Sequence, residues 1–184
     1  MRYQLKRTVV LVGMMGAGKT AVGTALARTL AVPFLDSDAE IVKAANMTIA
    51  EIFERDGEAF FRRKESQVIS RLLASSRKGI LSTGGGAYLR PENRAAIAAR
   101  GVAVWLRAPI ELLWQRVRHK DSRPLLRTAD PRATLVEMAA AREPAYAKAE
   151  LVVDADAGYS IDDMAERVIE ALLTRPDVLT RRKT

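Results

Sequence analysis

The stretch TVVLVGMMGAGKTAVG, residues 8–23, decides the fold of this chain. Five residues that favour a buried strand lead into a glycine-rich loop, and a lysine and a threonine follow where a helix should begin. Gly13, Gly18, Lys19 and Thr20 fit the spacing G-x-x-x-x-G-K-[ST]. In that pattern, backbone N–H groups and the positive end of a helix surround a phosphate. The stretch therefore predicts a phosphate-binding loop.

The residues after the loop support this interpretation over a plain glycine turn. Val22, Leu26 and Leu30 recur at helical spacing and mark the apolar face of a helix. A strand–loop–helix unit is the setting that the motif requires. In it, Lys19 would reach the β- and γ-phosphates of a nucleotide and the Thr20 hydroxyl would ligate Mg²⁺.

Size and composition limit the remaining possibilities. The 184 residues suit one well-buried domain over residues 1–184, and no apolar run approaches the roughly 20 residues that cross a bilayer. The chain has no cysteine, which excludes disulfides and thiolate metal sites and fits the cytoplasm. A net charge of +8 suggests an anionic partner, either nucleic acid or a small phosphorylated molecule, but no aromatic-rich RNA-binding pattern is present. We expect the basic tail, about residues 175–184, to be a solvated and frayed end.

Short apolar runs alternate with amphipathic helical patterns along the chain. The expected strands are Thr8–Val12, Pro33–Leu35, Ile80–Leu81, Val102–Leu106 and Leu151–Val153. Helical spacing is clear at Ile110, Leu113, Trp114 and Val117, and Ser160 followed by Asp163 predicts the start of a last helix. This alternation favours an α/β fold of three layers, with a five-stranded parallel sheet between helices. The segment RHKDSRPLLRTADP, residues 118–131, is charged and contains prolines, and we expect it to form a long loop.

A second group of polar residues follows the next expected strand. The sequence FLDSD places Asp36 and Asp38 at the carboxyl edge of the sheet, where α/β proteins bind ligands. Two carboxylates beside a triphosphate could hold metal-bound water, orient a substrate hydroxyl or act as a base. The structural alternative is N-capping of a helix before Ala39, which Ser37 or Asp38 could do alone.

Two more segments suggest a site for a second substrate. In STGGGAYL, Gly84–Gly86 directly follow a strand, and glycines there let a ligand approach the backbone closely, although they could simply form a loose connection. In GEAFFRRKES, Arg62 and Arg63 lie on an expected helix, where arginines usually form a solvated face.

Taken in order, these segments resemble the shikimate kinase family, whose members are phosphate-binding-loop enzymes similar to nucleoside monophosphate kinases. The resemblance runs from about Thr8 to Asp154 through the motifs GMMGAGKT, FLDSD, GEAFFRRKE, TGGGA, SRPLL and AREPAY. One phosphate-binding loop is common, but this series of motifs is specific.

The resemblance implies an acceptor site. Asp38, Arg62, Arg142 and the backbone at Gly85 would bind shikimate, with the two arginines on its carboxylate and Asp38 on its ring hydroxyls. Guanidinium forks suit a planar carboxylate better than lysine does. Glu65 would support the arginine cluster.

The resemblance also implies a nucleotide side. The ATP contacts would come from Gly16, Ala17, Gly18, Lys19, Thr20, Ala21 and Arg123. Arg123 would belong to a small lid at about residues 117–130. Lys19, Asp38 and Arg123 would be catalytic, while Thr20 and Asp36, the latter through water, would hold Mg²⁺. Regions that contact adenine would lie near Arg116 and after Asp154.

The implied activity is transfer of the γ-phosphoryl group of MgATP to the 3-hydroxyl of shikimate. The family resemblance implies a monomer whose partners are ATP and shikimate. From the composition we expect a cytoplasmic protein with no nucleic-acid partner and no membrane. Two alternatives stay open on the sequence alone. One is another small-molecule kinase, such as a gluconokinase, and the other is a non-catalytic nucleotide-binding module.

Overall fold

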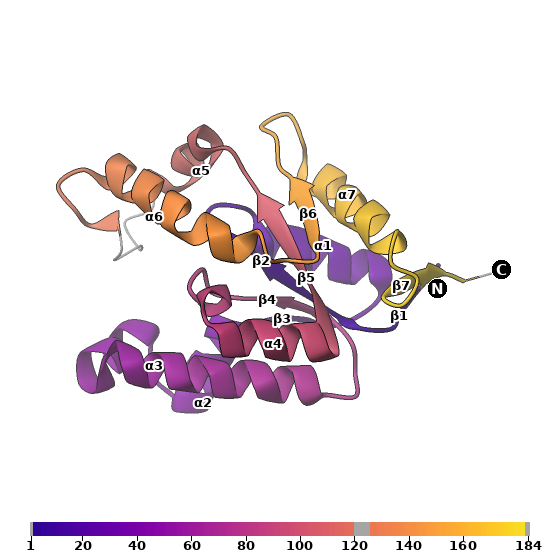
Figure 1. Cartoon of the computed structure of the whole chain (residues 1–184), viewed down its shortest axis with the longest axis horizontal. Coiled ribbons are helices and arrows are strands. Elements are labelled where there is room, and N and C mark those ends of the chain that lie inside the picture. The colour runs from indigo at the N-terminus through magenta and orange to yellow at the C-terminus, as the bar shows by residue number, and fades with distance from the viewer. Residues whose placement is uncertain (1, 120–125, 183–184) are drawn as a thin grey trace.

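The structure, a computed structural model, describes residues 2–119 and 126–182. The described chain forms a five-stranded parallel sheet in the order β3-β4-β2-β5-β6 (Figure 1). Its strands are β3 (Phe34–Asp36), β4 (Ile80–Ser82), β2 (Thr8–Val12), β5 (Gly101–Arg107) and β6 (Leu151–Asp154). All five expected strands are confirmed, with ends that differ by at most one residue.

The central strand is the one that the opening motif predicted. Every residue of β2 is buried, and its two neighbours are β4 and β5. In the parallel register, Val9 lies opposite both Ile80 and Val102. A strand covered on both faces reads as a continuous apolar run, which explains why the alternation of a half-exposed strand is absent here.

Helices cover both faces of the sheet, as predicted. They are α1 (Lys19–Leu30), α2 (Ser37–Ala45), α3 (Ile49–Ala74), α4 (Pro91–Arg100), α5 (Ile110–Val117), α6 (Pro131–Tyr146) and α7 (Ile161–Leu173), with a short 3₁₀ turn η1 (Ala87–Leu89). One face carries α1 and α7, which pack on each other, and the other carries α3 and α4 (Figure 1). The predicted apolar face of α1 is confirmed, because Val22, Leu26 and Leu30 are all buried.

Local signals set the helix ends. Ser160 Oγ accepts a hydrogen bond from the Asp163 N–H, and the Asp163 carboxylate accepts one from the Ser160 N–H. This reciprocal pair satisfies two N–H groups that the first turn of α7 leaves unpaired. The predicted start of the last helix is therefore confirmed. The long helix α3 is kinked at Gly57, whose φ is 83° and ψ 170°.

The basic tail differs from the prediction of a frayed end. Strand β7 (Leu179–Arg181) pairs antiparallel with β1 (Tyr3–Leu5) in a second, two-stranded sheet. Val178 and Leu179 are 0% and 1% exposed. Because these apolar side chains pack in the core, the basic residues that follow them in sequence are held in place through residue 182. Residues 183–184 lie outside the described residues.

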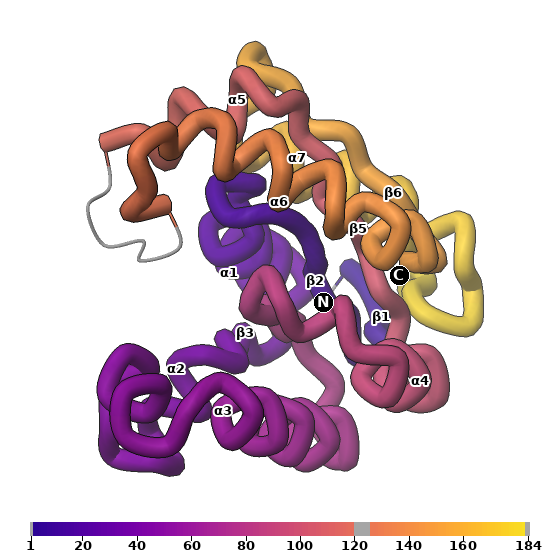
Figure 2. The backbone as a smooth tube through the Cα atoms, turned by 60° about the vertical axis from the view of Figure 1, so that its left-hand side comes forward, coloured from indigo at the N-terminus to yellow at the C-terminus, as the bar shows by residue number. Residues whose placement is uncertain are grey.

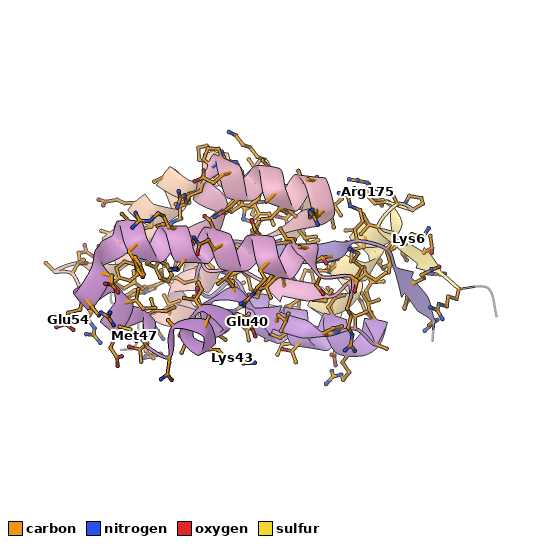
Figure 3. All side chains as sticks on the ribbon, turned by 90° about the horizontal axis from the view of Figure 1, so that it is seen from below. Lys6, Glu40, Lys43, Met47, Glu54 and Arg175 are labelled. Carbon is orange, nitrogen blue, oxygen red and sulfur yellow. The ribbon has the colours of Figure 1, made fainter. Side chains whose placement is uncertain are left out.

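The two-stranded sheet lies at one end of the molecule. Lys6 Nζ donates a hydrogen bond to the Pro176 carbonyl at 2.9 Å, which ties the start of the chain to the segment before β7. Figure 3 shows Lys6 and Arg175 together at this end, whereas Met47 and Glu54, from α2–α3, lie at the other. Among the described residues, no helix has the length and apolar character needed to cross a membrane.

The expected lid, about residues 117–130, falls partly outside the described residues. The segment 120–125, which contains Arg123, is not described. Val117 ends α5, and the Asp130 carboxylate accepts a hydrogen bond from the Ala133 N–H to cap α6. The lid and the single-domain organisation stay predictions.

The buried tail predicts a measurable effect on stability. Leu179→Ala removes a buried side chain and should lower the free energy of unfolding by about 3 kcal/mol in urea titrations. Thr180→Ala, on the neighbouring and half-buried residue of β7, is the matched control and should change it by less than about 1 kcal/mol. Equal and small effects of both substitutions would contradict packing of the tail against the core.

Candidate functional site

The chemistry-bearing segments meet at one edge of the sheet. The glycine loop follows β2, Asp36 ends β3, and Gly84–Gly86 come shortly after β4. Because these three strands are parallel neighbours, their carboxyl ends lie side by side, which is where open α/β sheets bind ligands. Helices α2 and α3 lie on one side of β2 and α1, and α5 and α6 lie on the other (Figure 2).

The loop after β2 has the backbone of an anion cradle. Gly16 and Gly18 have φ values of 82° and 92°, in a region of backbone conformation that residues other than glycine rarely adopt. Gly18 is the N-cap of α1, so the first N–H groups of the helix open into the loop. Lys19 Nζ donates to the carbonyls of Gly13 and Met14 at 2.6 and 3.0 Å, which places its ammonium group across the loop.

Arg116 holds the loop from outside. Its guanidinium Nη1 donates to the Gly16 carbonyl at 2.9 Å and lies 3.6 Å from the place where a Cβ on Gly18 would be. The family resemblance implies only that Arg116 lies near the region that contacts adenine. In the structure this arginine adds positive charge directly to the phosphate-binding loop.

The two aspartates after β3 have different roles. Asp36 Oδ1 accepts a hydrogen bond from the Ala39 N–H at 3.0 Å and is the N-cap of α2. N-capping by Ser37 or Asp38 was the structural alternative for this segment, but the cap comes from Asp36 instead. Ser37 is buried, and its hydroxyl accepts a hydrogen bond from the Gly84 N–H. Asp38, in the first turn, faces the glycine segment instead.

Asp38 lies among charges of both signs. Burial raises the pKa of its carboxyl above the ordinary value, and the neighbouring Asp36 raises this pKa further. Lys19 and Arg62 act in the opposite direction without cancelling the increase. Asp38 is thus close to both the phosphate-binding lysine and the predicted substrate arginine.

The triple glycine brings the predicted acceptor residues together. A Cβ on Gly84 would lie 2.8 Å from the Asp38 carboxylate. On Gly85 it would lie 2.6 Å from Arg142 Nη1, and on Gly86 it would lie 2.6 Å from both terminal nitrogens of Arg62. Any side chain at these positions would displace the charged group in front of it. The glycines therefore let this protein's own side chains, as well as any ligand, approach the backbone closely.

Arg62 is oriented by a buried carboxylate. Glu65 is 0% exposed and accepts a hydrogen bond from Arg62 Nη1 at 3.0 Å, so the expected support of the arginine by Glu65 is confirmed. Burial raises the pKa of the Glu65 carboxyl, and Arg62 opposes this increase. The adjacent Arg63 is exposed and lies over the Phe60 ring. Arg63 thus lies on the solvated face of the helix, as arginines usually do, whereas Arg62 is half-buried.

Helix α6 supplies the other arginine and one residue that sequence reasoning missed. Tyr146 is buried, and its hydroxyl donates to the Gly85 carbonyl at 2.6 Å. Arg142 and Tyr146 are four residues apart in the motif AREPAY, so they lie on the same face of the helix. That spacing was a signal that could have identified Tyr146.

The arrangement can hold an acidic, hydroxylated molecule next to a nucleotide. Arg62 and Arg142 provide two guanidinium groups for a carboxylate, and Asp38 can accept hydrogen bonds from hydroxyls. The Thr20 hydroxyl and the Asp36 carboxylate are hard oxygen donors of the kind that hold Mg²⁺ together with phosphates. Among the described residues, no group of three or more His, Cys, Asp or Glu side chains is arranged so that it could hold a metal ion. The two oxygen donors of Thr20 and Asp36 fit a metal ion that is bound together with a nucleotide.

Known proteins are similar to this chain in sequence and in architecture. A family model described as shikimate kinase matches residues 15–173. A shikimate kinase from Ruegeria pomeroyi is 65% identical over 95% of this chain and 89% of its own length. One from Cereibacter sphaeroides is 63% identical over 96% of this chain and 87% of its own length.

Solved structures agree with the sequence comparison. A shikimate kinase from Acinetobacter baumannii, in complex with shikimate, superposes with a TM-score of 0.84 at 39% identity and covers 91% of this chain and 93% of that one. A gluconokinase from Sinorhizobium meliloti reaches a TM-score of 0.60 at 18% identity, covering 95% of each chain, which shows a common fold alone. The fold, the convergent charges and the relatives agree that this chain belongs to the shikimate kinase family.

Proposed function

We propose that this chain is an ATP-dependent small-molecule kinase that phosphorylates shikimate on its 3-hydroxyl, releasing ADP. One observation carries the proposal. The carboxylate of Asp38 and the guanidinium groups of Arg62 and Arg142 converge on three consecutive glycines beside the phosphate-binding loop. A site with two cations and one carboxylate suits a ligand that carries one carboxylate and several hydroxyls.

The proposed mechanism relies on alignment and charge. Arg62 and Arg142 hold the carboxylate of the acceptor, which fixes the ring. Asp38 orients the hydroxyl that attacks the γ-phosphorus and accepts its proton as the new P–O bond forms and the bond to ADP breaks. Lys19 offsets the negative charge on the transferring group. A raised pKa at Asp38 favours this role because it increases the affinity of the carboxylate for the proton.

The nucleotide side completes the proposal. The loop residues Gly16–Ala21 surround the phosphates, and Thr20 and Asp36 would hold Mg²⁺, the latter through water. When bound with ATP, this ion neutralises phosphate charge and orients the γ-phosphoryl group. Arg123 of the lid, about residues 117–130, would close over the phosphates and exclude water. We further propose that the chain acts as a single-domain cytoplasmic monomer on these two small substrates.

A panel of acceptors tests the proposed function. ADP release with MgATP should depend on shikimate and stay at the background level with gluconate, AMP or RNA. The Lys19→Ala variant should lower kcat by at least about 100-fold, since it removes a charge that offsets the transferring phosphoryl group. Turnover that gluconate supports equally well, or that needs no acceptor, would reject the shikimate assignment.

The triple glycine predicts an unusual effect of adding one methyl group. Gly86→Ala should push the Arg62 guanidinium out of the site and raise the KM for shikimate about tenfold or more, the effect of a lost charged hydrogen bond. The melting temperature should fall as well, because moving the Arg62 guanidinium removes the hydrogen bond that it donates to the buried Glu65 carboxylate. Arg62→Ala should give a similar KM, while Arg63→Ala, on the exposed neighbour, should stay within about twofold of the wild type. A normal KM in Gly86→Ala would contradict this geometry.

The raised pKa of Asp38 predicts a gain of stability when the charge is removed. Below the carboxyl pKa, wild-type Asp38 is neutral, but above it the buried group must ionise at a cost. Asp38→Asn should therefore raise the melting temperature more at pH 8 than at pH 4, while lowering kcat strongly. Asp163→Asn is the matched control with the opposite sign, because hydrogen bonds from Ser160 lower the pKa of that carboxyl. A pH-independent gain in Asp38→Asn would contradict the assigned cause.

A further inference from the structure

The carbonyl of Gly85 is held differently from those of its two glycine neighbours. The Gly84 carbonyl accepts from the Ala87 N–H and the Gly86 carbonyl from the Leu89 N–H, both within the same turn. The Gly85 carbonyl instead accepts from the hydroxyl of Tyr146, which is 61 residues further along the chain in α6. The orientation of this one peptide group therefore depends on a distant helix.

Three consecutive glycines do not hold one backbone conformation by themselves, because glycine has the largest conformational freedom to lose. The segment is fixed from outside at two adjacent residues. On the side of α2, the Ser37 hydroxyl accepts from the Gly84 N–H at 3.3 Å. On the side of α6, Tyr146 donates to the Gly85 carbonyl at 2.6 Å. Since the C=O and N–H of one peptide point in opposite directions, fixing the Gly85 carbonyl also fixes the Gly86 N–H.

Tyr146 is built to be a rigid donor. Its side chain is 1% exposed, and its ring centroid lies 5.8 Å from that of Trp105 on the central sheet. Burial raises the pKa of its hydroxyl, and nearby Arg142 opposes this without cancelling it. The hydroxyl therefore stays protonated at neutral pH and can donate to a carbonyl.

The same contacts place Tyr146 next to the predicted substrate arginine of α6. Arg142 stands one helical turn before Tyr146, and its Nη1 is 2.6 Å from the place where a Cβ on Gly85 would be. One face of α6 thus presents to Gly85 both a cation for the acceptor and a donor for the backbone. Turning the Gly85–Gly86 peptide would bring other atoms into the narrow space that the Arg142 guanidinium uses.

We propose that Tyr146 is a positioning residue for the acceptor substrate. Its hydroxyl locks the Gly85–Gly86 peptide and so holds both the backbone at Gly85 and the guanidinium groups of Arg62 and Arg142 in the arrangement that binds shikimate. This inference rests on the proposed function, because it concerns the acceptor half of the same site. The nucleotide half, built on the loop after β2, has no part in it.

Tyr146→Phe tests this role because it removes the hydroxyl and keeps the ring that packs on Trp105. Steady-state kinetics with shikimate and ATP varied in turn should show a KM for shikimate about tenfold higher, the effect of leaving a buried carbonyl unpaired. The kcat at saturating shikimate and the KM for ATP should stay within about twofold. Calorimetric titration with shikimate should show the same loss of affinity as the KM.

Tyr88→Phe is the matched control. Tyr88 is also buried and lies two residues after the last glycine, but the charged groups that influence its hydroxyl are Glu150 and Arg94, outside the acceptor site. This variant should keep the wild-type KM for shikimate. An unchanged KM in Tyr146→Phe would overturn the inference, and so would an equal loss of ATP affinity, which would mean a general structural role. A wild type that does not phosphorylate shikimate would reject the proposed function instead.

Discussion

Three charged side chains lie against the backbone of Gly84–Gly86 at distances that leave no room for a Cβ atom. The acceptor half of the site depends on this close approach, because Asp38 comes from α2, Arg62 from α3 and Arg142 from α6. These side chains can approach the same short segment because glycine has no Cβ atom to exclude them. The cost of glycine in conformational entropy is offset by two hydrogen bonds, one from the Gly84 N–H to the Ser37 hydroxyl and one from the Tyr146 hydroxyl to the Gly85 carbonyl.

The parallel sheet determines where this point lies. With β2 in the centre and β4 beside it, the phosphate-binding loop and the triple glycine start from adjacent strand ends. The order of the parallel strands therefore places the loop after β2 next to the glycine segment after β4. Buried β2 and the helices on both faces make this frame rigid, as a reaction that depends on alignment requires.

The sequence was most informative where the physics is local. The glycine loop, the strands and the capping pair Ser160–Asp163 were all predictable, because spacing and neighbouring residues determine them. The pairing of β7 with β1 was not, since each strand has three residues and the partners are separated by nearly the whole chain. Arg62 and Arg63 could be separated only by the resemblance to a family, because both lie in the same helical pattern.

The roles that depend on backbone groups were the hardest to predict. Asp36 and not Ser37 or Asp38 caps α2, a choice that follows from the local dihedral angles at the end of β3. The spacing in AREPAY places Tyr146 on the same helix face as Arg142, but it does not identify the Gly85 carbonyl as the group that the Tyr146 hydroxyl contacts. Such contacts can be recognised only in the three-dimensional structure, whereas a charged residue is a candidate for a site by its residue type alone.

We infer that the triple glycine lets Asp38, Arg62 and Arg142 form one acceptor site. A crystal structure of the protein with bound shikimate would decide this. We expect the shikimate carboxylate between the guanidinium groups of Arg62 and Arg142, a ring hydroxyl on Asp38, and the ring against the backbone of Gly85. Shikimate bound away from Gly84–Gly86, or with its carboxylate on neither arginine, would contradict it.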